Sequence, residues 1–220
     1  MKLEVGDRLP ADIVWNTRVR DEEMARQGIQ NPYKWEKVVS GDLFKDKRVI
    51  LFALPGAFTP TCSAEQLPGY EENYQLFRTK GINEIYCLSV NDSFVMNAWF
   101  RHQQINGVKP IPDGSGDFTA AVGAIVDKDN LSFGKRSWRY SLLVNDGVIE
   151  AAFIEDGFGD NVGDDPFEVS DALTMYNYIM NESPVGQQLE LTLEQSMPFF
   201  FCFAILILGL VNSFSFSFPY

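Results

Sequence analysis

The chain has 220 residues, 45% of them apolar, and a formal net charge of −12. This length and composition are typical of one domain with a substantial core, or of one domain plus an appendage. The negative charge argues against nucleic acid and anionic membranes as partners. The three cysteines do not suggest a disulfide framework, and the N-terminus lacks the apolar core of a signal peptide, so we expect a reducing, cytoplasmic location.

The first third of the chain predicts a polar excursion, a buried strand and a helix. Residues 16–38 are polar and are interrupted by a glycine and a proline, which favours a long excursion before the first core strand. Residues 49–54 form an apolar run that is typical of a buried strand. Apolar or aromatic side chains then recur at helical spacing, and Pro68 should kink the helix that they indicate. These side chains are Leu67, Tyr70, Tyr74 and Phe77.

Cys62 is expected in the first turn of that helix. Thr59 is a suitable N-cap, whose hydroxyl would accept from the N–H of Thr61 or Cys62, and Pro60 fits the first helical position. The sulfur then lies among unpaired N–H groups at the positive end of the helix dipole, which stabilises a thiolate over a thiol. Because the thiolate is the reactive form, the sequence predicts an activated cysteine rather than an inert, buried one.

The middle of the chain predicts a second strand and a second helix. Residues 84–90 indicate a buried strand, which makes Cys87 an inert thiol. Asn91 or Ser93 should then cap a helix that runs to about Gln104. His102, the only histidine, lies on this helix beside polar neighbours and is expected at the surface.

A hairpin and a last helix complete the predicted domain. Residues 111–116 indicate a strand end and a turn, and the Asn-Asp-Gly sequence at 145–147 joins two strand-like segments into a β-hairpin. Ser170 is expected to open the last helix. The order of strand, helix, strand, helix, hairpin and helix predicts an α/β, thioredoxin-like fold, in which helices flank a central mixed sheet.

The C-terminal tail differs from the rest of the sequence. We expect a domain over residues 1–183 and an apolar tail over residues 184–220. Residues 199–211 carry no charge, yet they are fewer than the roughly 20 that span a bilayer, and no Lys or Arg flanks them. Three interpretations remain open: a membrane anchor, a docking segment, or a non-native extension without function, of which the last is favoured.

Several motifs resemble the peroxiredoxins. The spacing Pro55-x-x-x-Thr59-x-x-Cys62 is similar to the active-site signature of that family. The longer string PGAFTPTCSAEQLPGY resembles the type-five subfamily, including members fused to a glutaredoxin. The segments CLSVND, PIPDGSGDFTAAVG and FGKRSWRYSLLVNDGVIE are also similar, so the resemblance covers about residues 1–180.

This resemblance implies a thiol peroxidase that reduces hydrogen peroxide and organic hydroperoxides. Cys62 would be the peroxidatic cysteine, with Thr59 holding peroxide and thiolate together and Pro55 shielding the sulfur. Arg139 would be the active-site arginine that stabilises the thiolate and polarises the peroxide. The chemistry agrees, because attack on an O–O bond develops negative charge that a guanidinium stabilises. Strand alternation turns Arg136 away from Arg139, where a solvated charge at a strand edge is expected.

The chain departs from the family in the groups that would reduce Cys62. Members with an intramolecular mechanism carry a resolving cysteine near the position of Val169 or Ser170, and this chain has none there. It also lacks the C-x-x-C site of a fused glutaredoxin. We therefore expect a one-cysteine enzyme that an external thiol regenerates, either glutathione with a separate glutaredoxin or thioredoxin. No cofactor or metal is expected, and a homodimer is among the expected assemblies.

Two other functions are consistent with parts of the sequence. A cysteine hydrolase would need His102 as the base beside Cys62. A redox sensor or holdase of thioredoxin-like fold would dock its partners through the apolar tail.

Overall fold

A five-stranded mixed sheet forms the centre of the computed structural model, which describes residues 3–163 and 165–182. The strand order is β5-β4-β3-β8-β9, with β3, β4 and β5 parallel and with β8 and β9 antiparallel to their neighbours. The strands span Arg48–Ala53 (β3), Glu84–Ser89 (β4), Lys109–Pro112 (β5), Tyr140–Asn145 (β8) and Val148–Ile154 (β9). This sheet confirms the predicted thioredoxin-like α/β fold.

The remaining elements precede, connect or follow these strands. Two small antiparallel sheets are formed by β1 (Val14–Arg20) with β2 (Tyr33–Val39) and by β6 (Ile125–Asp127) with β7 (Lys135–Ser137). The helices are α1 (Glu22–Arg26), α2 (Ser40–Phe44), the π-helical turn η1 (Cys62–Gln66), α3 (Leu67–Glu72), α4 (Tyr74–Thr79), α5 (Ser93–His102), α6 (Asp117–Ala121), the 3-10 turn η2 (Asp129–Leu131) and α7 (Ala172–Glu182). None of the helices in the described ranges is long and apolar enough to cross a bilayer.

The chain divides into two units, residues 1–176 and residues 177–220. In the second unit the structure describes only residues 177–182, which are helical. The predicted boundary at residue 183 stays a prediction, and the apolar tail lies outside the described residues.

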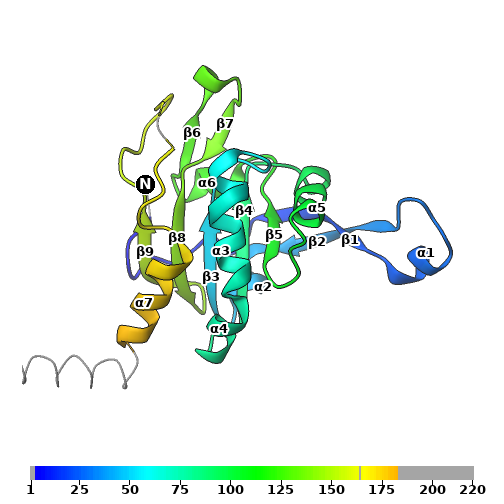
Figure 1. Cartoon of the computed structure of the whole chain (residues 1–220), viewed down its shortest axis with the longest axis horizontal. Coiled ribbons are helices and arrows are strands. Elements are labelled where there is room, and N and C mark those ends of the chain that lie inside the picture. The colour runs from blue at the N-terminus through cyan, green and yellow to red at the C-terminus, as the bar shows by residue number, and fades with distance from the viewer. Residues whose placement is uncertain (1–2, 164, 183–220) are drawn as a thin grey trace, which may run out of the picture. The chain divides into compact units, whose positions relative to one another are not determined.

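Both faces of the central sheet are covered, which explains why β3 is apolar from Val49 to its end. Leu51 and Ala53 contribute to a core cluster on one face, together with Phe44 from α2 and Phe118 from α6. On the other face Phe52 stacks on Tyr70 of α3, with ring centroids 4.2 Å apart. Figure 1 shows α3 lying across the sheet. A strand buried on both faces appears in sequence as a continuous apolar run, as predicted.

The polar excursion over residues 16–38 is ordered, which the sequence did not predict. Its two strands, β1 and β2, pair antiparallel, with Val14 opposite Val39 and Arg20 opposite Tyr33. They extend away from the central sheet and carry α1 near their far end (Figure 1). We call residues 14–39 the arm. Most of its side chains are exposed or half-buried, so the arm lacks the apolar run that would indicate a strand.

The N-caps of two helices also differ from those predicted from the sequence. Asp92, not Asn91 or Ser93, caps α5, because its carboxylate accepts from the N–H groups of Phe94 and Val95. Asp171, not Ser170, caps α7 in the same way. Each true cap lies beside the predicted residue, and several neighbouring polar residues were equally good candidates by type.

Candidate active site

The segment between β3 and α3 places Cys62 as predicted. Thr59 lies just before the helical residues, Pro60 is the first of them, and the Thr59 carbonyl accepts from the N–H of Ser63 at 3.0 Å. The hydroxyl of Thr59 differs from the prediction. It donates to the Gly56 carbonyl at 2.7 Å, and neither Thr61 nor Cys62 donates to it in the described structure. Thr59 is therefore an N-cap by position, and its hydroxyl ties the loop before the helix together.

The helix departs from α geometry at the cysteine itself. Residues Cys62–Gln66 form a π-helical turn, in which the N–H of Leu67 donates to the Cys62 carbonyl five residues earlier. Pro68 follows at the start of α3 and has no N–H to donate to Ala64. The predicted irregularity is thus present, but it begins ahead of the proline. Widened turns of this kind recur at functional sites.

Arg139 lies against Cys62 in the interior. Its side chain is 1% exposed, and Nη1 donates to the Cys62 Sγ at 3.4 Å and to the Gln66 Oε1 at 2.6 Å. Nη2 forms an ion pair with Asp165. Burial alone would lower the pKa of Arg139, but the charges of Cys62 and Asp165 outweigh it and raise that pKa. The guanidinium therefore stays charged beside the sulfur.

Gln66 and Asp165 are site residues that the sequence analysis missed. Gln66 is buried and follows Cys62 by four residues, so both lie on one face of the helix, a relation that sequence spacing does contain. Asp165 lies outside regular structure, between β9 and α7. No local pattern indicates its approach to Arg139, because only the folded chain brings the two together.

A cavity of about 220 Å³ lies beside the Cys62 loop. Its lining includes Pro55, Thr59 and Thr61 from the loop and Asp165 from the arginine side. The structure therefore brings Pro55 and Thr59 to one cavity, and it brings Arg139 to Cys62 through a direct contact. A space of this size accommodates a small molecule beside the loop that carries Cys62.

Arg136 differs from the prediction of a solvated charge. It is half-buried, and its Nη1 donates to the Val90 carbonyl at 2.8 Å while its guanidinium lies over the Phe133 ring. Its neighbours differ from those of Arg139, so the two arginines point to different surroundings, as expected. The cause is not alternation along one strand, because Arg136 lies in β7 and Arg139 lies between β7 and β8. A backbone carbonyl that accepts from a distant side chain leaves no mark in the sequence.

Comparison with known proteins places this site in a family. The family model described as Redoxin matches residues 4–174. A peroxiredoxin of Rhizobium etli is 56% identical over 158 residues, which cover 72% of this chain and 87% of that protein. The chain belongs to the peroxiredoxin family. A hybrid peroxiredoxin of Haemophilus influenzae, named hyPrx5, is 47% identical over 166 residues, 76% of this chain and 67% of that protein.

Solved peroxiredoxin structures share the fold. The crystal structure of a Plasmodium falciparum antioxidant protein, described as a 1-Cys peroxiredoxin, superposes with a TM-score of 0.74 at 32% identity. The match covers 80% of this chain and 99% of that one. The chain is accordingly a peroxidase of the peroxiredoxin type, which uses a peroxide substrate and a thiol reductant.

The second described cysteine of this peroxiredoxin is placed very differently from the first. Cys87 lies in the middle of β4, between Phe52 of β3 and Pro110 of β5, and is fully buried. Burial, and then the charge of Cys62, raise the pKa of the Cys87 thiol well above its usual range. The prediction that Cys87 is a buried thiol is confirmed.

His102 is not placed to act as a general base for Cys62. Its side chain is exposed, and its ring lies 5.8 Å from that of Phe58. In the described structure the sulfur is bonded to Arg139 and not to His102. A cysteine hydrolase needs a base within hydrogen-bond reach of the nucleophile, so this arrangement argues against the hydrolase alternative.

Proposed function

We propose that the chain reduces hydrogen peroxide and organic hydroperoxides by a one-cysteine mechanism, with glutathione and a separate glutaredoxin as the reducing system. The observation that carries this proposal is the contact of the buried Arg139 guanidinium with the Cys62 sulfur at 3.4 Å. A fixed positive charge at that place stabilises negative charge both on the sulfur and on an oxygen bound next to it.

In the proposed first step the Cys62 thiolate attacks the terminal oxygen of the peroxide. The O–O bond breaks as the S–O bond forms, so that sulfur becomes a sulfenic acid and the other oxygen leaves as water or alcohol after it takes a proton. Negative charge moves from sulfur to the leaving oxygen during this step. Arg139 is held by Gln66 and Asp165, and therefore needs little reorganisation to face that charge.

Thr59 and Pro55 have supporting roles in this proposal. The Thr59 hydroxyl donates to Gly56 but keeps lone pairs that can accept from a peroxide O–H. Thr59 and Pro55 both line the cavity beside the Cys62 loop, where Pro55 limits access of water to the sulfur. The role of Thr59 is thus to orient the peroxide, and that of Pro55 is to shield the thiolate.

The regenerating steps need thiols from outside the chain. One glutathione displaces water from the sulfenic acid to give a mixed disulfide with Cys62. The glutaredoxin thiolate then attacks the glutathione sulfur of that disulfide, which restores Cys62 and leaves glutaredoxin carrying the glutathione. A second glutathione restores glutaredoxin and leaves as glutathione disulfide. Three observations support this sequence. Cys87 is held within β4, the matching Plasmodium protein is described as a 1-Cys peroxiredoxin, and a buried sulfur is reached more readily by a small thiol than by a protein.

A steady-state peroxidase assay tests the choice of reductant. Turnover of hydrogen peroxide is measured with glutathione plus glutaredoxin, and separately with thioredoxin plus its reductase. We expect the first system to support sustained turnover and the second to be much slower. Faster turnover with thioredoxin would overturn the proposed reductant and leave the role of Cys62 intact. Absence of turnover with both would contradict the peroxidase cycle itself.

The alternative function as a redox sensor or holdase depends on the apolar tail. That tail lies outside the described residues, and no observation within residues 3–163 and 165–182 favours this function. The same assay separates the two, since a sensor would consume one equivalent of peroxide and then stop.

A further inference from the structure

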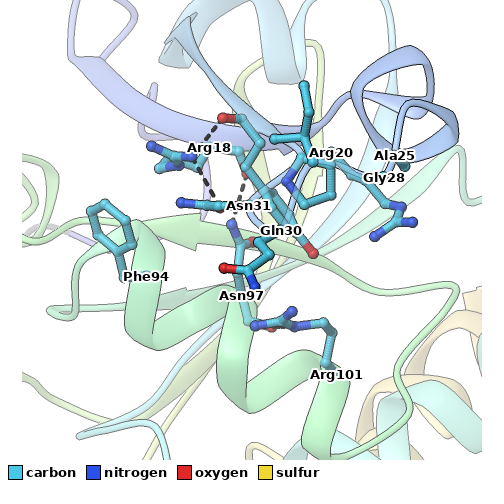
Figure 2. Close-up of a pocket in the computed structure, with 12 residues that line it drawn as sticks. Arg18, Arg20, Ala25, Gly28, Gln30, Asn31, Phe94, Asn97 and Arg101 are labelled. Atoms are coloured by element: carbon cyan, nitrogen blue, oxygen red, sulfur yellow. Dashed lines mark hydrogen bonds between the residues drawn. The ribbon is translucent and has the colours of Figure 1, made fainter.

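A second cavity lies between the arm and α5, with a volume of about 440 Å³. Figure 2 shows Arg18 from the arm together with Asn97 and Arg101 from α5 around this space. Its charged, amide and aromatic lining includes Arg18, Arg20, Asn31, Phe94, Asn97 and Arg101. Its volume lies in the range of about 300–1,000 Å³ that is usual for small-molecule sites. None of these residues lines the cavity beside Cys62.

The cavity is basic although the protein is acidic. The chain has 30 acidic and 18 basic residues, yet three arginines line this one space. Arg20 pairs with Glu22 at 3.0 Å. Arg18 and Arg101 form no ion pair with any acid in the described part of the chain. Two guanidinium groups that share a cavity repel each other, and a bound anion would remove that repulsion.

Arg18 is held in place rather than free in solvent. Its guanidinium lies over the rings of Trp35 and Phe94, at 5.2 and 5.1 Å from their centroids. Its Nη2 donates to the Tyr33 carbonyl and to the Asn31 Oδ1. Within the described structure its Nε and Nη1 have no acceptor. A stacked and anchored arginine has lost most of its side-chain freedom, so binding a ligand costs less entropy.

The side chain of Arg101, which lines the cavity from α5, also has contacts that hold it. Arg101 lies over the Tyr33 ring, and its Nε donates to the Asn97 carbonyl at 3.2 Å, which leaves both Nη groups without an acceptor in the described residues. Asn97 joins the two walls, because its Nδ2 donates to the Arg18 carbonyl at 2.8 Å. The ordinary alternative is a set of solvated surface arginines. That alternative explains neither the stacking of Arg18 nor the link between the arm and α5.

We propose that this cavity binds a small anion with two or more acidic groups, carboxylate or phosphate. Each guanidinium presents a planar fork that matches a carboxylate or a phosphate, and two forks that line one cavity select a ligand with two such groups. The asparagine amides and the aromatic rings supply polar and flat contacts for the rest of the molecule. This site is separate from the peroxidase chemistry and does not rest on the proposed reductant.

Isothermal titration calorimetry of the reduced full-length chain at low ionic strength tests this proposal. Pyrophosphate is the phosphate probe and citrate is the carboxylate probe. We expect saturable binding of at least one probe, and the probe that binds more tightly identifies the acidic group. Arg101→Gln and Arg18→Gln should each weaken binding about tenfold or more, since each removes a charge-assisted contact. Added salt should also weaken it.

Two control variants make the result specific. Arg26→Gln removes an exposed arginine of the same arm that pairs with Glu23 and does not line the cavity, and it should leave binding unchanged. Cys62→Ser should also bind normally, whereas Arg101→Gln should keep peroxidase activity. If neither probe saturates, if Arg26→Gln weakens binding as much as Arg101→Gln, or if Cys62→Ser abolishes it, the proposal is wrong. Arg101 lies on the exposed side of α5, so Arg101→Gln decides the matter even if Arg18→Gln fails to fold.

Discussion

The two described cysteines are equally buried but have very different surroundings. Cys62 and Cys87 are both fully inaccessible to solvent. Cys62 begins a π-helical turn and faces a charged guanidinium, whereas Cys87 lies in the central sheet, where burial raises the pKa of its thiol. Burial alone therefore does not decide the reactivity of a thiol. The groups next to the sulfur must also be considered, and at Cys62 these include the Arg139 guanidinium.

Exchange of each sulfur for oxygen should show the largest difference between the two sites. Cys62→Ser should lower the peroxidase rate by about three orders of magnitude or more, because a serine hydroxyl does not ionise at neutral pH. Cys87→Ser should keep most of the activity. Steady-state peroxide consumption is the measurement, with circular dichroism as the check of folding. If the Cys87→Ser protein folds but shows no turnover, Cys87 takes part in the reaction and the contrast between the two cysteines is wrong.

The guanidinium of Arg139 beside Cys62 should give the next largest effect when it is replaced. Arg139→Lys should lower the peroxidase kcat/KM by about 10²-fold, because a lysine cannot bond Cys62, Gln66 and Asp165 at once. Arg136→Lys is the matched control and should have a mild effect, since one amine can still reach the Val90 carbonyl. Equal losses in the two variants would mean that fold stability, and not the contact with sulfur, sets the activity.

Asp165 tests whether the position of Arg139 matters as well as its charge. Asp165→Asn should lower kcat/KM by about tenfold, because Arg139 loses the ion pair that helps to aim it. Asp156→Asn, a change at an exposed carboxylate in the segment after β9, should have no effect. The rate of Cys62 alkylation, measured together with the melting temperature, separates a change at the site from a loss of stability. A lower melting temperature with unchanged alkylation would assign Asp165 a structural role only.

The smallest expected effect concerns Glu155, whose carboxylate should make the stability of the fold depend on pH. Burial would raise the pKa of Glu155, but hydrogen bonds from the Ser170 hydroxyl and from the N–H groups of residues 168–170 outweigh it and lower the pKa below the ordinary 4.5. A lowered folded-state pKa means that the carboxylate stabilises the fold above about pH 4.5 and that this contribution is lost as the pH falls through the lowered value.

Thermal unfolding at several pH values checks this contribution. Glu155→Gln should be less stable than the wild type at neutral pH, and the difference should shrink in acid. Ser170 also accepts hydrogen bonds from the Tyr70 hydroxyl and the Gln66 amide. Loss of the Glu155 carboxylate should therefore also destabilise the contacts of these two residues, which belong to the helical segment that carries Cys62. A constant difference across the pH range would mean that the charge of Glu155 is not what stabilises this region.

Sequence analysis predicted the parts of the molecule that are built from local signals. The apolar run of β3, the Thr-Pro start of the helix and the Asn-Asp-Gly turn each determine their own structure, so the position of Cys62 in the first turn of the helix was predicted correctly. Arg139 came from a family motif rather than from spacing. The arm was missed because its strands are exposed and carry no apolar run.

The partners of Arg139 show where local signals end. Gln66 could have been predicted from the sequence, because its spacing from Cys62 places both on one face of the helix. Asp165 was not, because its approach to Arg139 depends on the path of the chain after β9. The half-buried placement of Arg136 was not predicted for the same reason, because its acceptor is a backbone carbonyl 46 residues away in sequence.

Oxidation by one equivalent of hydrogen peroxide, without added thiol, tests the one-cysteine mechanism most directly. Mass spectrometry of the peptides should find sulfenic acid on Cys62, and sulfinic acid there when the oxidant is in excess. Added glutathione should give a single mixed disulfide at that residue. A disulfide needs Cα atoms within about 7 Å and suitably directed Cβ atoms, and Cys87 is fixed in β4 between two paired strands. A dominant Cys62–Cys87 or Cys62–Cys202 disulfide, within or between chains, would contradict the one-cysteine mechanism.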